Sequence, residues 1–438
     1  ITAGMALAPS LAMAEVSEET AFVFNTFSFL VHGVLVMFMA AGFAMLESGL
    51  VRTKNTATIC LKNIALYSIA GLMYYIIGYS LMYTDVSGYI GSLSLFYDPS
   101  DAEIALKAAD EATPEMVAEV VGGGYSVMSD WFFQMVFVAT AASIVSGTVA
   151  ERIKLWPFLI FVIILTGIIY PIQGSWTWGG GWLSEMGFSD FAGSTIVHSV
   201  GGWAALTGAI ILGARKGKYG PNGEVQPIPG ANLPLATLGT FVLWFGWFGF
   251  NGGSQLALGS ALDAAAIAIV YVNTNLAAAG GVVAAMVASQ LLYGKVDLTM
   301  ALNGAIAGLV SITAGPDLDS HILSVIIGAV GGVLVVFAIP ALDKLKIDDV
   351  VGAISAHLVA GIWGTLAVGI FGAGDIVAQV IGIVAIGAFT IITSAIAWFA
   401  LKFTMGLRVD EEEEVNGLDR SELGMDAYPE FGPRASSL

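Results

Sequence analysis

Two histidines inside long apolar stretches are the residues of this chain best suited to chemistry. His198 lies in STIVHSVGGWAALTGAIILG and His357 in AISAHLVAGIWGTLAVGIFG. Each is followed by Val at +2, Gly at +4, Ile at +13 and Gly at +15. Burying an imidazole in a membrane helix is costly, so such residues are functional candidates. Their matching positions in the two halves predict a pseudo-symmetric pathway with both rings facing one lumen.

The environment of these histidines predicts their protonation state. Burial disfavours the charged form, so we expect neutral rings, one donating a hydrogen bond to the other. A neutral pair in a narrow apolar tube binds a small polar molecule better than a desolvated metal ion, which favours a solute that can shed its proton over K⁺. The alternative is a pair that only links helices. His32 and His321 have no such partner and are interpreted as structural.

Two further helix faces carry side chains suited to a weak cation. Phe133 and Phe137 are four residues apart, as are Phe250 and Ser254, and residues with this spacing share a face. A ring attracts a partly dehydrated cation, and a hydroxyl accepts a hydrogen bond from it. Trp178 would complete such a cage. Singly, however, aromatic residues in membrane helices usually pack or face lipid.

Asp190 opens the segment DFAGSTIVHS, about two turns before His198. We expect its carboxylate to cap the helix and to attract a cation. Ser194 is the only candidate nucleophile beside a base, and it can equally bond its own backbone, so we do not expect an enzyme. Two histidines without a third ligand make no usual metal site, and the single Cys60 excludes a thiol cluster. We expect no metal and no cofactor.

The composition indicates a membrane protein. Of 438 residues, 57% are hydrophobic and only 11% are charged, whereas soluble domains have about 25% charged residues. Apolar runs of about 20 residues can cross the hydrocarbon core. Length and periodicity predict an all-α polytopic protein with eleven transmembrane helices, at roughly 21–48, 57–83, 126–149, 156–176, 192–214, 233–255, 264–292, 298–313, 321–339, 351–371 and 376–403.

The basic residues predict the orientation of these helices. If the N-terminus lies outside, the outer loops contain only Lys107. The histidine-bearing spans are the fifth and the tenth, so the halves have opposite polarity, a 5+5 inverted repeat with a terminal helix. We therefore expect N-out/C-in topology, with these basic residues inside: Arg52, Lys54, Arg152, Lys154, Arg215, Lys216, Lys218, Lys295, Lys344, Lys346, Lys402 and Arg408.

The net charge of −18 is concentrated in residues 98–119 and in the acidic C-terminal tail, and it argues against nucleic acid as a partner. Residues 12–14 (Ala-Met-Ala) fit a signal-peptidase cleavage pattern. We therefore expect three parts: a signal peptide remnant at 1–14, a membrane domain at 15–403 and a cytoplasmic tail at 404–438.

Several stretches, in order and spacing, closely resemble the Amt/Rh ammonium transporter family, specifically its bacterial Amt branch. The resemblance covers the chain from the first span into the tail. It is carried by GLVRTKN at 49–55, FFQMVF at 132–137, GTVAERI at 147–153, WGGG at 178–181, DFAGSTIVH at 190–198, GWFGFNGGS at 246–254 and HLVAGIWGTLAVGIF at 357–371.

The resemblance implies roles for the outer residues. Trp178, Phe137 and Ser254 match the family's outer ammonium-recruitment site, and Phe133 and Gln134 match the vestibule beside it. In the family, NH₄⁺ is recognised at this site and then deprotonated. Ammonia crosses a hydrophobic pore, and in many members the proton crosses too.

The resemblance also implies roles along the pore. Phe137 and Phe250 match the stacked phenyl gate, and His198 and His357 match the twin-histidine pair. Asp190 matches the family's outer aspartate. The implied assembly is a homotrimer in the cell inner membrane, each subunit with its own pore, and the tail resembles one that helps to bind a PII-type regulatory protein.

Two departures lie on the inner side of the tenth span. Many relatives have Asp five residues before the second histidine, where this chain has Gly352, and Pro is frequent at the position of Ser355. The shape of the inner vestibule and the transport rate are therefore open. Some Amt-like proteins act as ammonium sensors, and an ammonium sensor with little or no transport is the alternative function.

Overall fold

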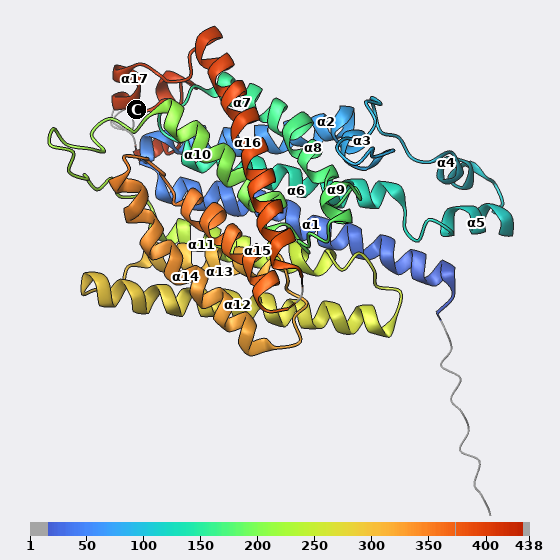
Figure 1. The fold of residues 1–438 in the computed structure, drawn as a ribbon. Helices are drawn as coiled ribbons and strands as arrows, with labels where there is room; N and C mark the ends of the chain where they lie inside the picture. The colour runs from blue at the N-terminus through green and yellow to red at the C-terminus, as the bar shows by residue number, and fades with distance from the viewer. Residues whose placement is uncertain (1–15, 373, 432–438) are drawn as a thin grey trace, which may run out of the picture.

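Helices form the whole framework of the protein over the residues that the structure, a computed structural model, describes, 16–372 and 374–431 (Figure 1). Two isolated bridges, Ile153–Arg408 and Tyr219–Val225, are the only β-type pairings in these ranges. The predicted signal peptide remnant, 1–14, lies outside the described residues, as does the end of the tail, 432–438.

Nine helical segments among the described residues are long and apolar enough to cross a membrane. Two shorter apolar segments, α13 (Leu298–Ile312) and η5–α15 (Ile354–Ile370), accompany them. All eleven coincide in position with the predicted spans, although the number of crossings stays a prediction. The nine are α1 (Glu18–Leu50), η1–α3 (Thr53–Tyr83), α6 (Val127–Thr148), α7–α8 (Leu155–Ser175), η4–α10 (Ser194–Leu212), α11 (Leu233–Gly253), α12 (Ala261–Tyr293), α14 (His321–Lys344) and α16 (Ile376–Thr404).

Four of the eleven segments contain a π-helical turn, which inserts an extra residue and is frequent at functional sites. The composite segments divide as follows: η1 (Thr53–Asn55), α2 (Thr56–Met73), η2 (Tyr74–Gly78) and α3 (Tyr79–Tyr83); α7 (Leu155–Ile164), η3 (Leu165–Ile169) and α8 (Tyr170–Ser175); η4 (Ser194–Ser199) and α10 (Val200–Leu212); η5 (Ile354–Val359) and α15 (Ala360–Ile370).

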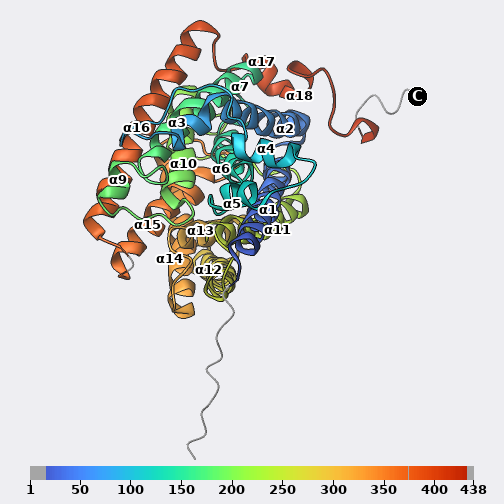
Figure 2. The same cartoon turned by 90° about the vertical axis from the view of Figure 1, so that its right-hand side faces the viewer.

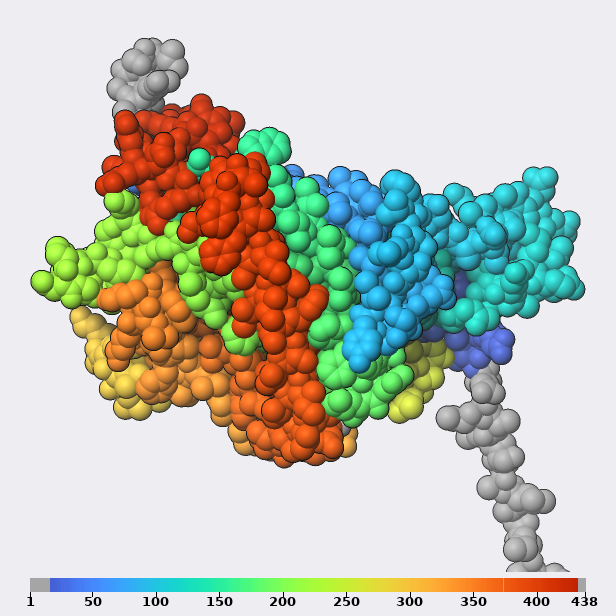
Figure 3. Space-filling model, turned by 45° about the horizontal axis from the view of Figure 1, so that its top comes forward, coloured from blue at the N-terminus to red at the C-terminus, as the bar shows by residue number. Residues whose placement is uncertain are grey.

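The connecting segments form small structures at opposite ends of the bundle. At one end α4 (Asp101–Ala108) and α5 (Pro114–Val121) form a projecting lobe, and α9 (Trp182–Glu185) lies in another loop (Figures 1 and 2). The tail, with α17 (Glu411–Asn416), α18 (Leu418–Ser421) and η6 (Pro429–Phe431), lies at the other end. Figure 3 shows the lobe and the tail separated by the length of the bundle.

Close helix packing places the central helix α6 against the elements that carry the histidines. Helix α6 is buried along nearly its whole length and contacts α1, α10, η4 and η5. Helix α1 runs along α11, and a Cβ at Gly42 would lie 2.9 Å from the backbone nitrogen of Leu243. Small residues of this kind let membrane helices approach closely, so the core is filled by helices in direct contact.

Candidate functional site

The two predicted histidines meet in the interior. His198 lies in η4 and His357 in η5, with 0% and 2% of their surface exposed. Their Nδ1 atoms are 3.2 Å apart, and the ring planes are inclined by 20°. The sequence therefore predicted correctly that the two halves bring the imidazoles into hydrogen-bond contact. One ring donates to the other, since a neutral imidazole has one donor and one acceptor nitrogen.

A carboxylate eight residues before each histidine caps its π-helical turn. Asp190 accepts hydrogen bonds from the backbone N–H groups of Gly193, Ser194, Thr195 and Ile196 at 2.8–3.0 Å. Burial raises the pKa of Asp190, and these four N–H groups oppose the increase. The predicted capping role of Asp190 is thus seen directly, while its attraction of a cation stays a prediction.

Asp349 caps the turn of His357 in the same way. Its carboxylate accepts from the N–H groups of Ala353 and Ile354 at 3.1 and 2.8 Å and from the Thr148 hydroxyl at 3.0 Å. Burial raises its pKa to about 6, although these hydrogen bonds oppose the increase. The sequence stage did not single out Asp349. Its spacing to His357, which equals that of Asp190 to His198, was the available signal.

This arrangement explains one of the two departures. Gly352 has φ +79°, and a Cβ there would lie 2.7 Å from Oδ1 of Asn303, so a side chain at this position would be strained. The counterpart of Asp190 is therefore Asp349, three residues earlier. At the second departure, the Ser355 hydroxyl is buried without a hydrogen-bond partner.

The predicted cation-binding residues line one cavity of about 360 Å³ at the lobe end of the bundle. The Trp178 indole donates to the carbonyl oxygen of Asp190 at 2.9 Å, which ties the cavity wall to the cap of η4. The Ser254 hydroxyl donates to the carbonyl of Phe250 at 2.8 Å and keeps its lone pairs as acceptors. The lining comprises Phe133, Gln134, Phe137, Trp178 and Ser254, together with Tyr79, Tyr83, Tyr125, Asp130, Phe191 and Leu256.

Two phenyl rings separate this cavity from the histidines. The ring centroids of Phe137 and Phe250 are 4.1 Å apart, and the Phe137 ring is 6.0 Å from Trp178. On its other side Phe250 lies 5.2 Å from the His198 ring. The cavity, the phenyl pair and the histidine pair therefore follow one another through the core.

Two residues of this region were missed at the sequence stage. Asp130 lies in the cavity wall, where it accepts from the Tyr79 hydroxyl at 2.5 Å and from the Gln134 amide at 3.2 Å. A carboxylate in an apolar span was the signal that could have identified it. Trp247 stacks on His198 at 4.9 Å and donates to Thr313 at 2.8 Å. One tryptophan among many in apolar helices gave no usable signal.

The inner side carries two further cavities. One, about 10 Å³, is lined by His357 and by Glu47 of α1. The other, about 330 Å³, lies at the tail end and includes Asp349 and Gly352. Both are lined by Asn303 and Val351, so the two cavities adjoin. A series of spaces therefore continues from His357 toward the tail end.

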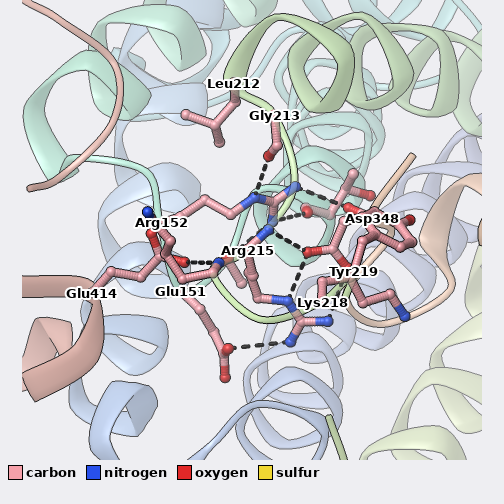
Figure 4. A network of polar contacts seen from close by, with 12 residues as sticks. Glu151, Arg152, Leu212, Gly213, Arg215, Lys218, Tyr219, Asp348 and Glu414 are labelled. Carbon is pink, nitrogen blue, oxygen red and sulfur yellow. Dashed lines mark hydrogen bonds and ion pairs between the residues drawn. The ribbon is translucent and has the colours of Figure 1, made fainter. Parts of the chain in front are cut away.

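A buried charge network supports the inner loops (Figure 4). Arg215 binds Asp348 at 2.8 Å and Glu151 at 3.1 Å, and Arg152 donates to the carbonyl of Asp348 at 2.9 Å. Burial would raise the pKa of Asp348, but Arg215 and Arg152 hold it well below its usual value. Arg215 and Arg52 lower the pKa of Glu151 in the same way, against the effect of burial.

The tail docks on the same loops. Asp419 accepts from the N–H groups of Ala57 and Thr58 at 2.9 and 2.8 Å and so caps α2. Glu414 accepts from the N–H of Lys216 at 2.7 Å and pairs with Arg408. The tail is thus part of the folded protein rather than a solvated extension.

The remaining candidates have structural partners. His32 bonds the Tyr271 hydroxyl through Nε2 at 3.0 Å, and His321 bonds the Asn273 side chain at 2.7 Å, in agreement with the structural interpretation. The hydroxyl of Ser194 donates to the carbonyl of Val310 at 2.6 Å. Ser194 therefore joins two helices.

An apolar helical bundle with a cation-type cavity leading to a buried histidine pair defines a membrane protein for a small polar solute. The comparisons with known proteins agree. Residues 27–428 match the model of the Ammonium Transporter Family. Ammonium transporter Amt2 of Archaeoglobus fulgidus is 40% identical over 92% of this chain and 87% of its own length. A putative ammonium transporter of Synechocystis is 40% identical over 93% of this chain and 89% of its own.

Solved structures show the same fold. A chain described as a sensor Amt protein superimposes with a TM-score of 0.83 at 36% identity, over 93% of this chain and all of that one. Candida albicans Mep2 superimposes with a TM-score of 0.78 at 29% identity, over 95% of this chain and 94% of its own. The protein belongs to the ammonium transporter family, whose members matched here are transporters and not enzymes.

Proposed function

We propose that this protein transports ammonium through a pore within the single chain. NH₄⁺ binds in the aromatic cavity beside Trp178, Phe137 and Ser254, and loses its proton before the phenyl pair. Ammonia passes Phe137 and Phe250 and crosses along His198 and His357, and the proton crosses as well. The observation that carries this proposal is the uninterrupted order of cavity, phenyl pair and histidine pair.

The chemistry of each stage supports the proposal. Aromatic faces attract a cation, and the Ser254 oxygen accepts an N–H bond from it. Beyond the phenyl pair the surroundings are apolar, and a desolvated charge there is costly. Ammonia is neutral after it sheds a proton and can use both imidazoles as hydrogen-bond partners. An alkali cation such as K⁺ can do neither.

The membrane arrangement is part of the proposal. We infer eleven crossings with the N-terminus outside and the C-terminus inside, a membrane domain at 15–403 and a cytoplasmic tail at 404–438. The location would be the cell inner membrane. Placement of the acidic lobe and the tail at opposite ends of the bundle supports this orientation. A homotrimer and binding of a PII-type regulator at the tail face rest on the family resemblance alone.

The alternative, an ammonium sensor with little or no transport, has one specific observation in its favour. The structural neighbour described as a sensor Amt protein shares 36% sequence identity with this chain over its whole length. Sensor and transporter therefore share this fold, and turnover must be measured.

Current on a solid-supported membrane tests the proposal. Purified protein in proteoliposomes receives an ammonium jump, with a potassium jump as control. We expect a sustained ammonium-specific current that decays faster as protein density rises. A brief transient independent of density means binding without turnover, and the sensor function then replaces this proposal. Without any signal, internal pH reports whether ammonia crosses electroneutrally.

The histidine pair provides the matched variant. His198→Ala combined with His357→Ala should abolish the current or its selectivity for ammonium over potassium in a protein that elutes and melts as a folded species. Wild-type current and selectivity in this double variant would contradict the role of the pair.

A further inference from the structure

A buried carboxylate on the inner side of the histidine pair has no function in the proposal above. Glu47 of α1 is 1% exposed and lies between α1 and α6. Its Oε2 accepts a hydrogen bond from the Ser146 hydroxyl at 2.8 Å, but its Oε1 has no hydrogen-bond partner. An unsatisfied buried acceptor is costly, so this atom calls for an explanation.

The nearby polar groups do not satisfy Oε1. Lys62 acts on the carboxylate through space, but its ammonium group donates to the carbonyl of Ser146 at 2.9 Å and lies over the ring of Phe158. The Asn63 amide donates to the carbonyl of Ile59 at 3.1 Å instead. Structural pairing therefore accounts for one carboxylate oxygen and leaves the other free.

The same carboxylate lines the small cavity below the histidines. This cavity holds about 10 Å³ and is lined by Glu47 and His357, and by Phe43, Ser143 and Asn303 among others. A single water-sized molecule needs about 10–15 Å³ by the same measure. The space fits one ammonia-sized molecule and excludes a larger amine.

The second polar wall of this cavity is the inner histidine. Nδ1 of His357 is engaged by His198 at 3.2 Å, which leaves Nε2 as its remaining polar atom. The hydroxyl of Ser143 is already bound to the carbonyl of Ala139 at 3.1 Å. The carboxylate oxygen and the imidazole are therefore the two groups that can hold a small N–H donor.

The backbone leaves room for this arrangement. Gly147 of α6 also lines the cavity, and a Cβ there would lie 3.5 Å from Cγ of Glu47 and in steric conflict with Val351. Asn303 and Val351 connect the space to the wider cavity at the tail end. A molecule released from the histidines toward the tail would pass Glu47.

We propose that Glu47 and His357 form an inner subsite that binds one molecule of ammonia or ammonium between the histidine pair and the inner vestibule. Oε1 of Glu47 accepts an N–H bond, and the imidazole provides the second contact. This inference rests on the proposed transport function and names a binding step within it.

Glu47→Gln tests the subsite. The amide keeps the size and can still accept from Ser146, but it turns an N–H group toward the cavity, where an acceptor is required. We expect the ammonium current to fall about 10-fold, as for loss of one hydrogen bond to a charged group. The half-saturating concentration should change little because the outer cavity is untouched. Ser143→Ala, in the same cavity, is the matched control and should keep the wild-type current.

A double variant separates the subsite from a structural role. Glu47→Gln with Lys62→Met removes both buried charges and leaves no unpaired cation, a change that folded proteins often tolerate. The current should remain as low as in Glu47→Gln. Recovery of wild-type current would show that Glu47 only balances Lys62 and would overturn the proposal.

A structure of the wild-type protein gives a readout that needs no variant and no turnover. In ammonium, density for one atom should lie within hydrogen-bond distance of Glu47 Oε1 and His357 Nε2, with higher occupancy than in potassium. An empty cavity, or equal density in both salts, would overturn the subsite. If wild-type protein gives no current, transport fails as the function, while this structure still reports on binding.

Discussion

At the scale of single residues, the outer cavity contains a negative charge that no cation of the chain neutralises. Asp130 is 7% exposed, and its two oxygens are bound by the neutral groups of Tyr79 and Gln134. A buried carboxylate without a counter-charge is costly. A cation entering the cavity would supply that charge, which gives Asp130 a direct effect on ammonium binding.

Asp130→Asn should raise the half-saturating ammonium concentration about 10-fold, because a charge-assisted contribution to binding is lost. Titration of the ammonium-induced current measures this. Tyr79→Phe removes the same hydrogen bond to Tyr79 but keeps the carboxylate, and it should bind ammonium almost normally. Equal losses in the two variants would show that Asp130 acts only by holding α3.

At the scale of elements, the loops at the tail end determine how the second histidine is held. Asp348 directly precedes Asp349, the cap of η5, and is bound by Arg215 from the loop after α10. This links the turn that carries His357 to the end of the helix that carries His198. Two elements of opposite halves are therefore fixed to each other at their inner ends.

Asp348→Asn should destabilise the folded protein by about 3 kcal/mol, because Arg215 then loses a buried partner. Thermal unfolding in detergent measures the effect. The lowered pKa of Asp348 means that its stabilisation is present above the unfolded-state value and is lost as the pH falls. The difference between wild type and variant should therefore be constant near neutral pH and shrink below about pH 4.

A control on the same face is Asp343→Asn. Asp343 pairs with Lys218 at 2.9 Å and is partly exposed, so its loss should cost only about 0–1 kcal/mol. An equal effect of the two substitutions, or a difference that grows at acidic pH, would contradict this account of the network.

At the scale of the whole molecule, the two halves are related by more than their histidines. Each half has a π-helical turn with a central histidine and an aspartate cap eight residues earlier. One cap lies toward the lobe and the other toward the tail, so the turns begin from opposite ends. This is the arrangement expected of an inverted repeat.

Single-cysteine labelling tests the orientation that follows. In a Cys60→Ser background, Glu111→Cys in the lobe should react with an impermeant maleimide in intact cells. Ser421→Cys in the tail should react only after the membrane is permeabilised. Labelling of Ser421→Cys in intact cells would show that the orientation is wrong.

The sequence by itself determined the apolar segments, the histidine pair and the aromatic faces. These depend on composition, on span length and on residues four apart on one helix, all of which are local properties of the chain. The family resemblance added the order of cavity, phenyl pair and histidines. Gly352 was recognised as a departure, but its cause was not.

Only the tertiary structure decided the partners of the buried charges. Arg215 meets Asp348 across 133 positions, and Asp419 of the tail caps α2 across 361. Glu47 and His357 line one cavity from helices in opposite halves. Such contacts depend on how helices pack, and the side-chain pattern of one helix does not specify which polar group of another it will meet.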